Sequence, residues 1–268
     1  MILTEYTELK SGGEFMNTIS AGNSMFNIYS HISSGLRINR AADDAAGLAI
    51  GQKMRQEETG LRVGGQNAQD GMGALNVADG ALGGVMDSLQ RIRDLALRSM
   101  NGIASSSDRA YYQDEINQLK EGIQSMSKTT SLNEQKLLDG SMADMYLATN
   151  PDGSGMRIGM ANSTLEALGI ADLDVTKGNF SLDDIDNAID MVSRQRGSLG
   201  AATNRLEHTY NNNATMTLEQ LSSRSRIEDL DMPKAISEKK KEDLLSEYRT
   251  LMLKRQMNQD SMVVKLFQ

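Results

Sequence analysis

The sequence contains no cysteine and no tryptophan, and only 4% of its 268 residues are aromatic. Without cysteine there can be no disulfide bond, no thiolate nucleophile and no cysteine-based metal site. The hydrophobic fraction is also low, at 39%, whereas a compact domain of this length normally uses more large apolar residues. The deficit fits thin bundles of long helices with narrow apolar seams, and it also fits partial disorder of the isolated chain.

The chain also lacks an excess of basic residues, because its net charge is −8 at pH 7. Binding to nucleic-acid phosphates requires a basic surface, so we expect no nucleic-acid partner. The N-terminus has no basic region followed by an apolar run, which excludes a secretory signal peptide, and no apolar segment reaches the ~20 residues that span a bilayer. We therefore expect no membrane insertion, and either a cytoplasmic protein or one exported by a dedicated route.

Residues that carry chemistry are few and scattered. The two histidines, His31 and His208, are far apart in the sequence and lack companions. The pair Asp43 and Asp44 is explained more simply by helix capping than by metal binding. The glycines do not form a phosphate-binding loop followed by Lys and Ser or Thr. We therefore predict that the protein is not an enzyme and has no catalytic residue, no cofactor and no metal.

The longest regular stretch runs from about residue 41 to residue 100 and contains no proline. Its small and apolar residues recur at alternating steps of three and four, which keeps them on one side of an α-helix. We predict a single very long helix, capped by Asp43 and packed lengthwise against partner helices. The predicted buried stripe consists of Leu75, Ala78, Leu82, Val85, Leu89, Ile92, Ala96 and Ser99.

Glycine is unusually frequent within this predicted helix, with eight glycines between residues 60 and 84. Each interior glycine costs a helix roughly 0.5–1 kcal/mol relative to alanine. The pattern makes sense if other segments approach the helix closely, or if the helix becomes ordered only on assembly. The alternative is a helix that breaks near Gly64 and Gly65.

Three further long helices and one hairpin follow from the pattern. A second helix is expected from Asp108 to about residue 127, and a third from an N-cap at Ser181 to about residue 230. Pro233 then opens a last helix, which stays apolar on one side almost to the final residue. Because free termini normally fray, such a helix must have a docking partner. Residues 145–149 and 156–160 flank a strong turn signal and predict a β-hairpin.

These elements predict a mainly α fold. It is a long antiparallel helical bundle or coiled-coil rod with a small β-hairpin region near residues 140–175, and both termini are helical and adjacent. A short helix is expected near residues 18–32, followed by an irregular connector from residue 33 to residue 43.

The connector and the start of the long helix, SSGLRINRAADDAAGLAI at residues 33–50, resemble the N-terminal signature of bacterial flagellins very closely. The resemblance continues through residues 67–82 and 89–99 and returns at 197–209 and 222–232. The last residues, MVVKLFQ, look like the apolar flagellin tail. The first 32 residues do not resemble the usual flagellin N-terminus, and Met16 offers an alternative first residue.

The resemblance implies a structural subunit that polymerises into the bacterial flagellar filament for swimming motility and is secreted to the extracellular filament. Residues 1–43 and 232–268 would be the terminal coiled-coil segments of the inner filament tube (D0-like), and residues 44–231 the helical rod with its hairpin (D1-like). Only about 40 residues, 139–180, lie between the helical parts. The chain therefore looks like a short flagellin that lacks the outer variable domains.

The resemblance also implies partners. These are other flagellin subunits in a helical homopolymer, the export chaperone FliS, cap and junction proteins, the host Toll-like receptor 5 (TLR5) and, for the tail, NAIP receptors. The positions that match the receptor and subunit interface are Arg91, Leu95 and Glu115, which we expect to be exposed. The C-terminal assembly and chaperone positions are Leu244, Leu245, Tyr248, Leu251, Met252, Met262, Val264, Leu266 and Phe267.

Two alternatives remain open from the sequence. One is a hook–filament junction protein, which shares the coiled-coil ends, and the other is a minor or non-polymerising flagellin paralogue.

Overall fold

The computed structural model describes residues 26–177 and 180–266 of the chain, and it describes side-chain surroundings up to residue 259. The described part is mainly helical, which confirms the predicted fold class. Its long helices are α2 (Ala45–Ser99), α3 (Ser106–Thr129), α4 (Leu182–Glu228) and α5 (Met232–Leu266). The chain forms two compact units: residues 56–218 make one, and the segments before residue 56 and after residue 218 make the other.

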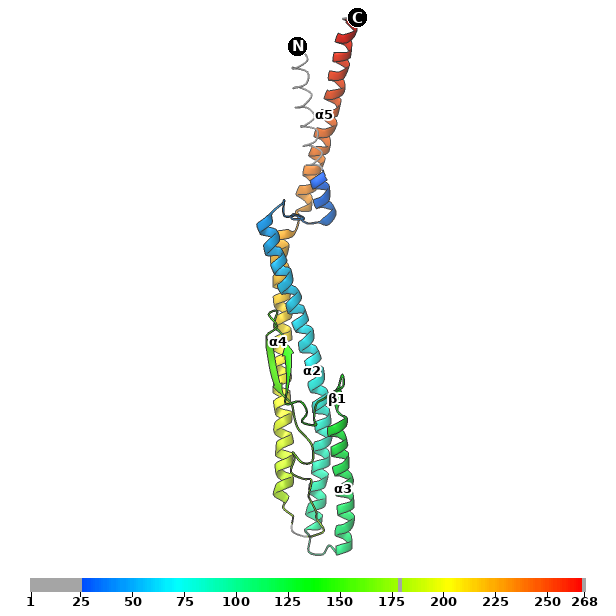
Figure 1. Ribbon diagram of the computed structural model, residues 1–268, viewed down its shortest axis with the longest axis vertical. Coiled ribbons are helices and arrows are strands. Elements are labelled where there is room, and N and C mark those ends of the chain that lie inside the picture. Colours follow the sequence, from blue (N-terminus) through cyan, green and yellow to red (C-terminus); the bar gives the residue numbers. More distant parts are fainter. Residues whose placement is uncertain (1–25, 178–179, 267–268) are drawn as a thin grey trace. The chain divides into compact units, whose positions relative to one another are not determined.

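The unit of residues 56–218 is built on three helical segments, from α2, α3 and α4, that lie side by side (Figure 1). All eight residues of the predicted α2 stripe are at most 2% exposed, so the three-and-four spacing identified the core correctly. Ile116 and Ile123 of α3 and Ile185, Val192 and Leu206 of α4 are fully buried against it. The period of the apolar residues therefore sets which face of each helix points inward.

The ends of the helices are set by side chains that accept hydrogen bonds from free backbone N–H groups. At α3, Ser105 Oγ accepts from Asp108 N at 3.1 Å and Asp108 Oδ2 accepts from Ser105 N at 3.0 Å, a reciprocal capping box. The helix therefore begins at Ser106, slightly before the predicted start. At α4, Ser181 Oγ accepts from Asp183 N at 3.0 Å, as predicted.

The prediction that Asp43 caps α2 is wrong by one residue. Asp44 Oδ1 accepts from Gly47 N at 2.8 Å and is the cap. Asp43 Oδ2 instead accepts from the backbone N–H groups of Asn39 and Arg40, both at 2.9 Å, and so closes the preceding turn. These two N–H groups hold the pKa of the Asp43 carboxyl below its usual range.

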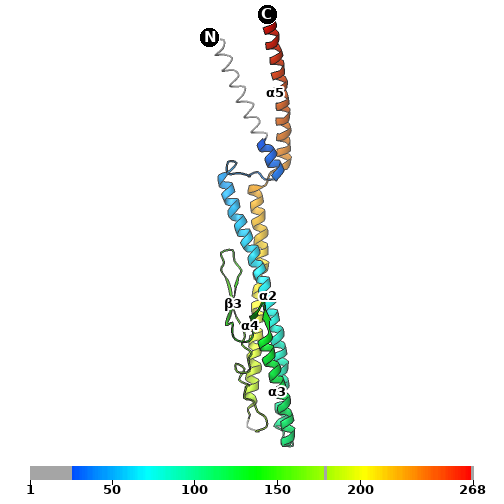
Figure 2. The same cartoon turned by 45° about the vertical axis from the view of Figure 1, so that its right-hand side comes forward.

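The predicted hairpin is present as β3 (Asp144–Ala148) and β4 (Gly155–Gly159), which pair antiparallel with Asp144 opposite Gly159. The hairpin runs alongside the helices of its unit (Figure 2). Two amides hold the residues at its turn, since Asn67 Nδ2 of α2 donates to Ala148 O and Asn213 Nδ2 of α4 donates to Thr149 O, both at 2.7 Å.

The glycines of α2 explain how the hairpin comes so close. A Cβ built on Gly64 would lie 2.2 Å from Thr149 O, and one on Gly60 would lie 2.7 Å from the Cα of Pro151. Both are far inside van der Waals contact, so only glycine fits at these positions. The helix is continuous from residue 45 to residue 99, so the alternative of a break near Gly64 and Gly65 is wrong.

Two features of this unit were not predicted. The first is a second, very short hairpin of β1 (Ser131–Leu132) and β2 (Gln135–Lys136), whose turn residues Asn133 and Glu134 both have positive φ. The second is the way α3 holds the irregular segment of residues 165–175. Gln113 Oε1 accepts from Val175 N at 2.7 Å, Gln124 Oε1 accepts from Leu165 N at 3.3 Å, and Lys120 Nζ donates to Ala171 O at 2.5 Å.

In the other unit, the predicted irregular connector pairs with the junction between α4 and α5. Arg37 N donates to Glu228 O at 2.6 Å and Leu230 N donates to Gly35 O at 2.9 Å. The Glu228 carboxylate is buried and is neutralised by Arg55 at 2.9 Å. It lies directly against Gly51, where a Cβ would meet Glu228 Oε1 at 2.0 Å. The described part of the expected first helix, residues 26–34, is helical, and Lys239 of α5 lies 4.6 Å from the centre of the Tyr29 ring.

Candidate functional site

Arg91 of α2 and Glu115 of α3 form an ion pair on the surface of the three-helix unit. The distance from an Arg91 guanidinium nitrogen to Glu115 Oε1 is 2.6 Å, and the two side chains are 45% and 42% exposed. The structure thus brings together two of the three predicted interface residues. A pair this exposed contributes about 0–1 kcal/mol to stability, so its charged atoms remain available to a partner.

Leu95, the third predicted interface residue, is not exposed. It is 1% exposed and belongs to the core, so the expectation of an exposed leucine is wrong. The reason is that α2 packs against both α3 and α4 (Figure 1). The buried part of its circumference is therefore wider than a single stripe of residues spaced by three and four, and it includes both Leu95 and Ala96. Substitutions at Leu95 therefore act on packing rather than on a surface.

The predicted assembly residues on α5 are exposed. Their exposed fractions lie between 37% and 67%, and the residues are Leu244, Leu245, Tyr248, Leu251 and Met252. Leu253 and Met257 are exposed as well and fall on the opposite side of the helix at 100° per residue, so the apolar surface of α5 is not a single stripe. Met262, Val264 and Leu266 lie in the helix by their backbone, while their side chains and all of Phe267 are outside the described residues.

Further exposed apolar residues, which were not predicted, lie at and near the turn between α2 and α3. Ile103 is 88% exposed, and Leu97, Met100 and Tyr111 around the same turn are exposed too. The turn reads NGIASSS, and a large aliphatic residue between such polar neighbours is the signal that could have identified these residues.

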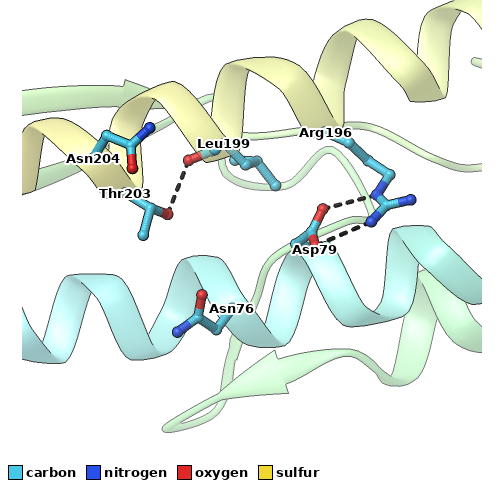
Figure 3. A pocket seen from close by; sticks show the side chains of 7 residues that line it. Asn76, Asp79, Arg196, Leu199, Thr203 and Asn204 are labelled. Carbon is cyan, nitrogen blue, oxygen red and sulfur yellow. Dashed lines mark hydrogen bonds and ion pairs between the residues drawn. The ribbon is translucent and has the colours of Figure 1, made fainter.

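A polar groove lies between α2 and α4 (Figure 3). One end is closed by a two-point ion pair, in which Arg196 Nε lies 2.8 Å from Asp79 Oδ1 and a second Arg196 nitrogen lies 3.2 Å from Oδ2. This pairing raises the pKa of Arg196 above its usual value. The carboxamides of Asn76 and Asn204 and the side chain of Leu199 line the rest of the groove, and the whole groove has a volume of about 350 Å³.

The groove can donate and accept hydrogen bonds, but it contains no histidine or cysteine that could serve as a base or nucleophile. Across the described residues, no three His, Cys, Asp or Glu side chains gather as metal ligands would. No helix in the described ranges has the length and apolar character to cross a membrane.

Comparison with known proteins points to one family. The sequence model of the bacterial flagellin N-terminal helical region matches residues 15–143, and that of the bacterial flagellin C-terminal helical region matches residues 182–267. The flagellin of Halalkalibacterium halodurans is 40% identical over 243 residues, which cover 88% of this chain and 89% of the relative. The chain belongs to the bacterial flagellin family.

A second relative agrees with this flagellin assignment, and one solved structure shows the same fold. The flagellar filament 33 kDa core protein of Treponema phagedenis is 35% identical and is covered to 85% of its length, with 83% of this chain matched. A solved structure of a putative flagellar hook-associated protein from Vibrio parahaemolyticus shares the fold, with a TM-score of 0.57 at 15% identity. That similarity covers 70% of this chain and all of the solved chain. The N-terminal family match begins at residue 15, so the expectation that the first 32 residues depart from flagellins is wrong for much of that stretch.

Membership of the flagellin family settles the general role. The chain is a structural subunit of the flagellar filament, which is an extracellular fibre, and flagellins form a structural rather than a catalytic family. The surfaces described above are therefore candidates for contacts between subunits.

Proposed function

We propose that this chain assembles into the filament for swimming motility by repeating one head-to-tail contact, and that the exposed apolar residues of α5 form part of that contact. A contact between two different surfaces that does not close on itself generates an open helical fibre. The observation that carries the proposal is the exposure of five large apolar side chains on one side of a helix, between Leu244 and Met252. A soluble monomer rarely leaves such a surface uncovered.

We assign residues 1–43 and 232–268 to the inner coiled-coil tube and residues 44–231 to the surrounding rod. The division of the chain into two compact units supports this assignment. The boundaries between these units along the chain fall after residues 55 and 218, inside α2 and α4. The segment between α3 and α4 spans only residues 130–181. This length supports a short flagellin without outer variable domains.

The same surface of α5 serves the chain before assembly. An export chaperone, FliS, covers it in the cytoplasm and keeps subunits from associating before secretion, and cap and junction proteins engage the filament ends. A helix whose apolar side chains lie in the groove of a partner is a common recognition mode. The C-terminal residues Val264, Leu266 and Phe267 are the positions for detection by NAIP receptors.

The rod presents a separate surface to TLR5. Arg91 and Glu115 are the contact residues, because they are exposed and charged, and Leu95 supports them from the core. An arginine at the centre of a small patch is a frequent hot spot in protein interfaces.

Deletion of residues 244–268 tests the assembly proposal. The core of the three-helix unit lies within residues 56–218, so the shortened chain should keep that unit folded and remain a monomer. Electron microscopy should then show filaments from the intact chain and none from the deletion variant, and FliS should co-purify only with the intact chain. Filaments from the deletion variant would overturn the proposal. If the intact chain also forms none, it is a non-polymerising paralogue.

A further inference from the structure

The turn that follows α2 contains the only Asn–Gly dipeptide in the sequence, Asn101–Gly102. Both residues are exposed to solvent. Asn101 Oδ1 lies 3.4 Å from Ile103 N and accepts a hydrogen bond from it, so the carboxamide is folded back over the peptide bond that follows. Glycine has no side chain that would hinder an approach to this peptide bond.

The backbone N–H of Gly102 is also free to react. In the described part of the chain it takes part in no backbone hydrogen bond, whereas the neighbouring amides do: Asn101 N donates to Arg98 O at 3.2 Å and Ala104 N donates to Asn101 O at 2.9 Å. The backbone nitrogen next to the Asn101 side chain is therefore one whose N–H makes no backbone hydrogen bond in this turn.

We propose that Asn101 is a site of spontaneous deamidation. The Gly102 backbone nitrogen loses its proton and attacks Cγ of Asn101, which forms a new C–N bond and a five-membered succinimide. The bond from Cγ to the side-chain nitrogen breaks, and that nitrogen leaves as ammonia after gaining a proton. Water then opens the ring at either carbonyl and gives aspartate or isoaspartate. The net reaction consumes one water and releases one ammonia, so no oxidant, reductant or enzyme is needed.

No other asparagine in the described residues is followed by glycine. Several also lack an exposed, unbonded N–H on the residue that follows. Asn150 precedes Pro151, which has no N–H. Asn162 precedes Ser163, which is buried and whose N–H donates to Leu138 O at 2.9 Å. Asn76 and Asn204 lie inside long helices, where the following amides are engaged in the helical hydrogen bonds.

The reaction would change the turn in two ways. A new carboxylate at residue 101 lies just after the C-terminal end of α2, the negative end of the helix dipole, so it is electrostatically unfavourable there. Isoaspartate also routes the backbone through the side-chain carbon and lengthens it. This lengthening disrupts the bond from Ala104 N to Asn101 O. The charge appears close in sequence to Met100 and Ile103, two exposed apolar residues of the same turn.

The chain offers a clean readout with an internal control. Cleavage after arginine and lysine releases peptide 99–109, in which Asn101 is the only carboxamide, and peptide 158–177, in which Asn162 is the only carboxamide. The full-length protein is incubated in mildly alkaline buffer, digested and analysed by mass spectrometry. We expect exchange of NH2 for OH in peptide 99–109, in two chromatographically distinct forms, well before any exchange in peptide 158–177. Equal rates in the two peptides would overturn the proposal.

The matched variant is Gly102→Ala. A Cβ built at Gly102 meets no atom within 4 Å, and the backbone there is not left-handed, so the variant should fold unchanged. It should lower the deamidation rate in peptide 99–109 to that of peptide 158–177. The proposal is also overturned if Gly102→Ala reacts as fast as the parent chain. Asn101→Asp supplies the reference for the aspartate product.

Discussion

Arg91 and Leu95 are one turn apart on α2, yet their surroundings differ. One residue is placed to contact a partner, and the other contributes to the stability of the fold. Arg91 is almost half exposed and pairs with Glu115, while Leu95 is buried between helices. A residue like Arg91 can contact a partner without affecting folding, and a residue like Leu95 can only affect folding. Measurements of receptor activation alone would confuse these roles, because an unfolded subunit also fails to activate a receptor.

Alanine substitutions at these two positions should therefore behave differently. Leu95→Ala leaves a cavity and should lower the free energy of unfolding by about 2–5 kcal/mol. Arg91→Ala breaks only an exposed ion pair and should lower it by about 0–1 kcal/mol, while weakening TLR5 signalling by purified monomer. Denaturant unfolding and a reporter-cell assay measure the two effects. Unchanged signalling by Arg91→Ala would count against the proposed receptor surface.

At the scale of elements, the docking of the hairpin on α2 and α4 depends on backbone atoms. Gly64 leaves room for Thr149 O, and Asn213 then donates to the same oxygen at 2.7 Å. Asn67 makes the equivalent bond to Ala148 O. Two side-chain amides thus bind the hairpin near its turn, and Gly64 allows its backbone to come close to α2. Together these contacts determine where along α2 the hairpin docks.

Glycine-to-alanine substitutions in α2 should lower the free energy of unfolding where the hairpin docks and raise it where nothing contacts the helix. Gly64→Ala should cost about 1–3 kcal/mol, because the new methyl group displaces Thr149 and strains the amide bonds, as overpacking does elsewhere. Gly73→Ala meets no atom within 4 Å and should stabilise the helix by about 0.5–1 kcal/mol. Denaturant unfolding gives both values, and hydrogen exchange of residues 144–159 should quicken only in Gly64→Ala. A stabilising Gly64→Ala would show that the hairpin is not held this way.

The elements differ in how well the sequence predicted them, for physical reasons. The seams of α2, α3 and α4 were predictable because burial on one side of a helix imposes a regular spacing. The bonds from Gln113, Lys120 and Gln124 to residues 165–175 were not, because a side chain that bonds a distant backbone leaves no periodic signal. Leu95 was misplaced because the spacing describes one seam, whereas α2 has partners on two sides.

The same distinction applies to the candidate sites. The exposed apolar residues of α5 were predictable, since a terminal helix rich in leucine has too few partners of its own. The pairing of Arg91 with Glu115 required the structure, because it joins two helices. The apolar turn around Ile103 was missed because its residues come from two helices and the loop between them.

At the scale of the whole molecule, assembly has to bury surface that the monomer leaves in solvent. Leu251 on α5 is 57% exposed, so a filament contact can bury roughly half of its side chain, which is worth about 1–1.5 kcal/mol. Lys240 on the same helix is also exposed but is not part of the apolar set. Converting each residue to asparagine gives two variants with the same new side chain on the same helix.

Leu251→Asn should raise the critical monomer concentration for filament growth about tenfold, because ~1.4 kcal/mol corresponds to a factor of ten in an equilibrium constant. Lys240→Asn should leave it nearly unchanged. Sedimentation of filaments from purified chains measures the concentration, and circular dichroism checks that both variants retain the helicity of the parent. If the two variants polymerise equally well, Leu251 takes no part in the filament contact, and the proposed assembly surface on α5 is wrong.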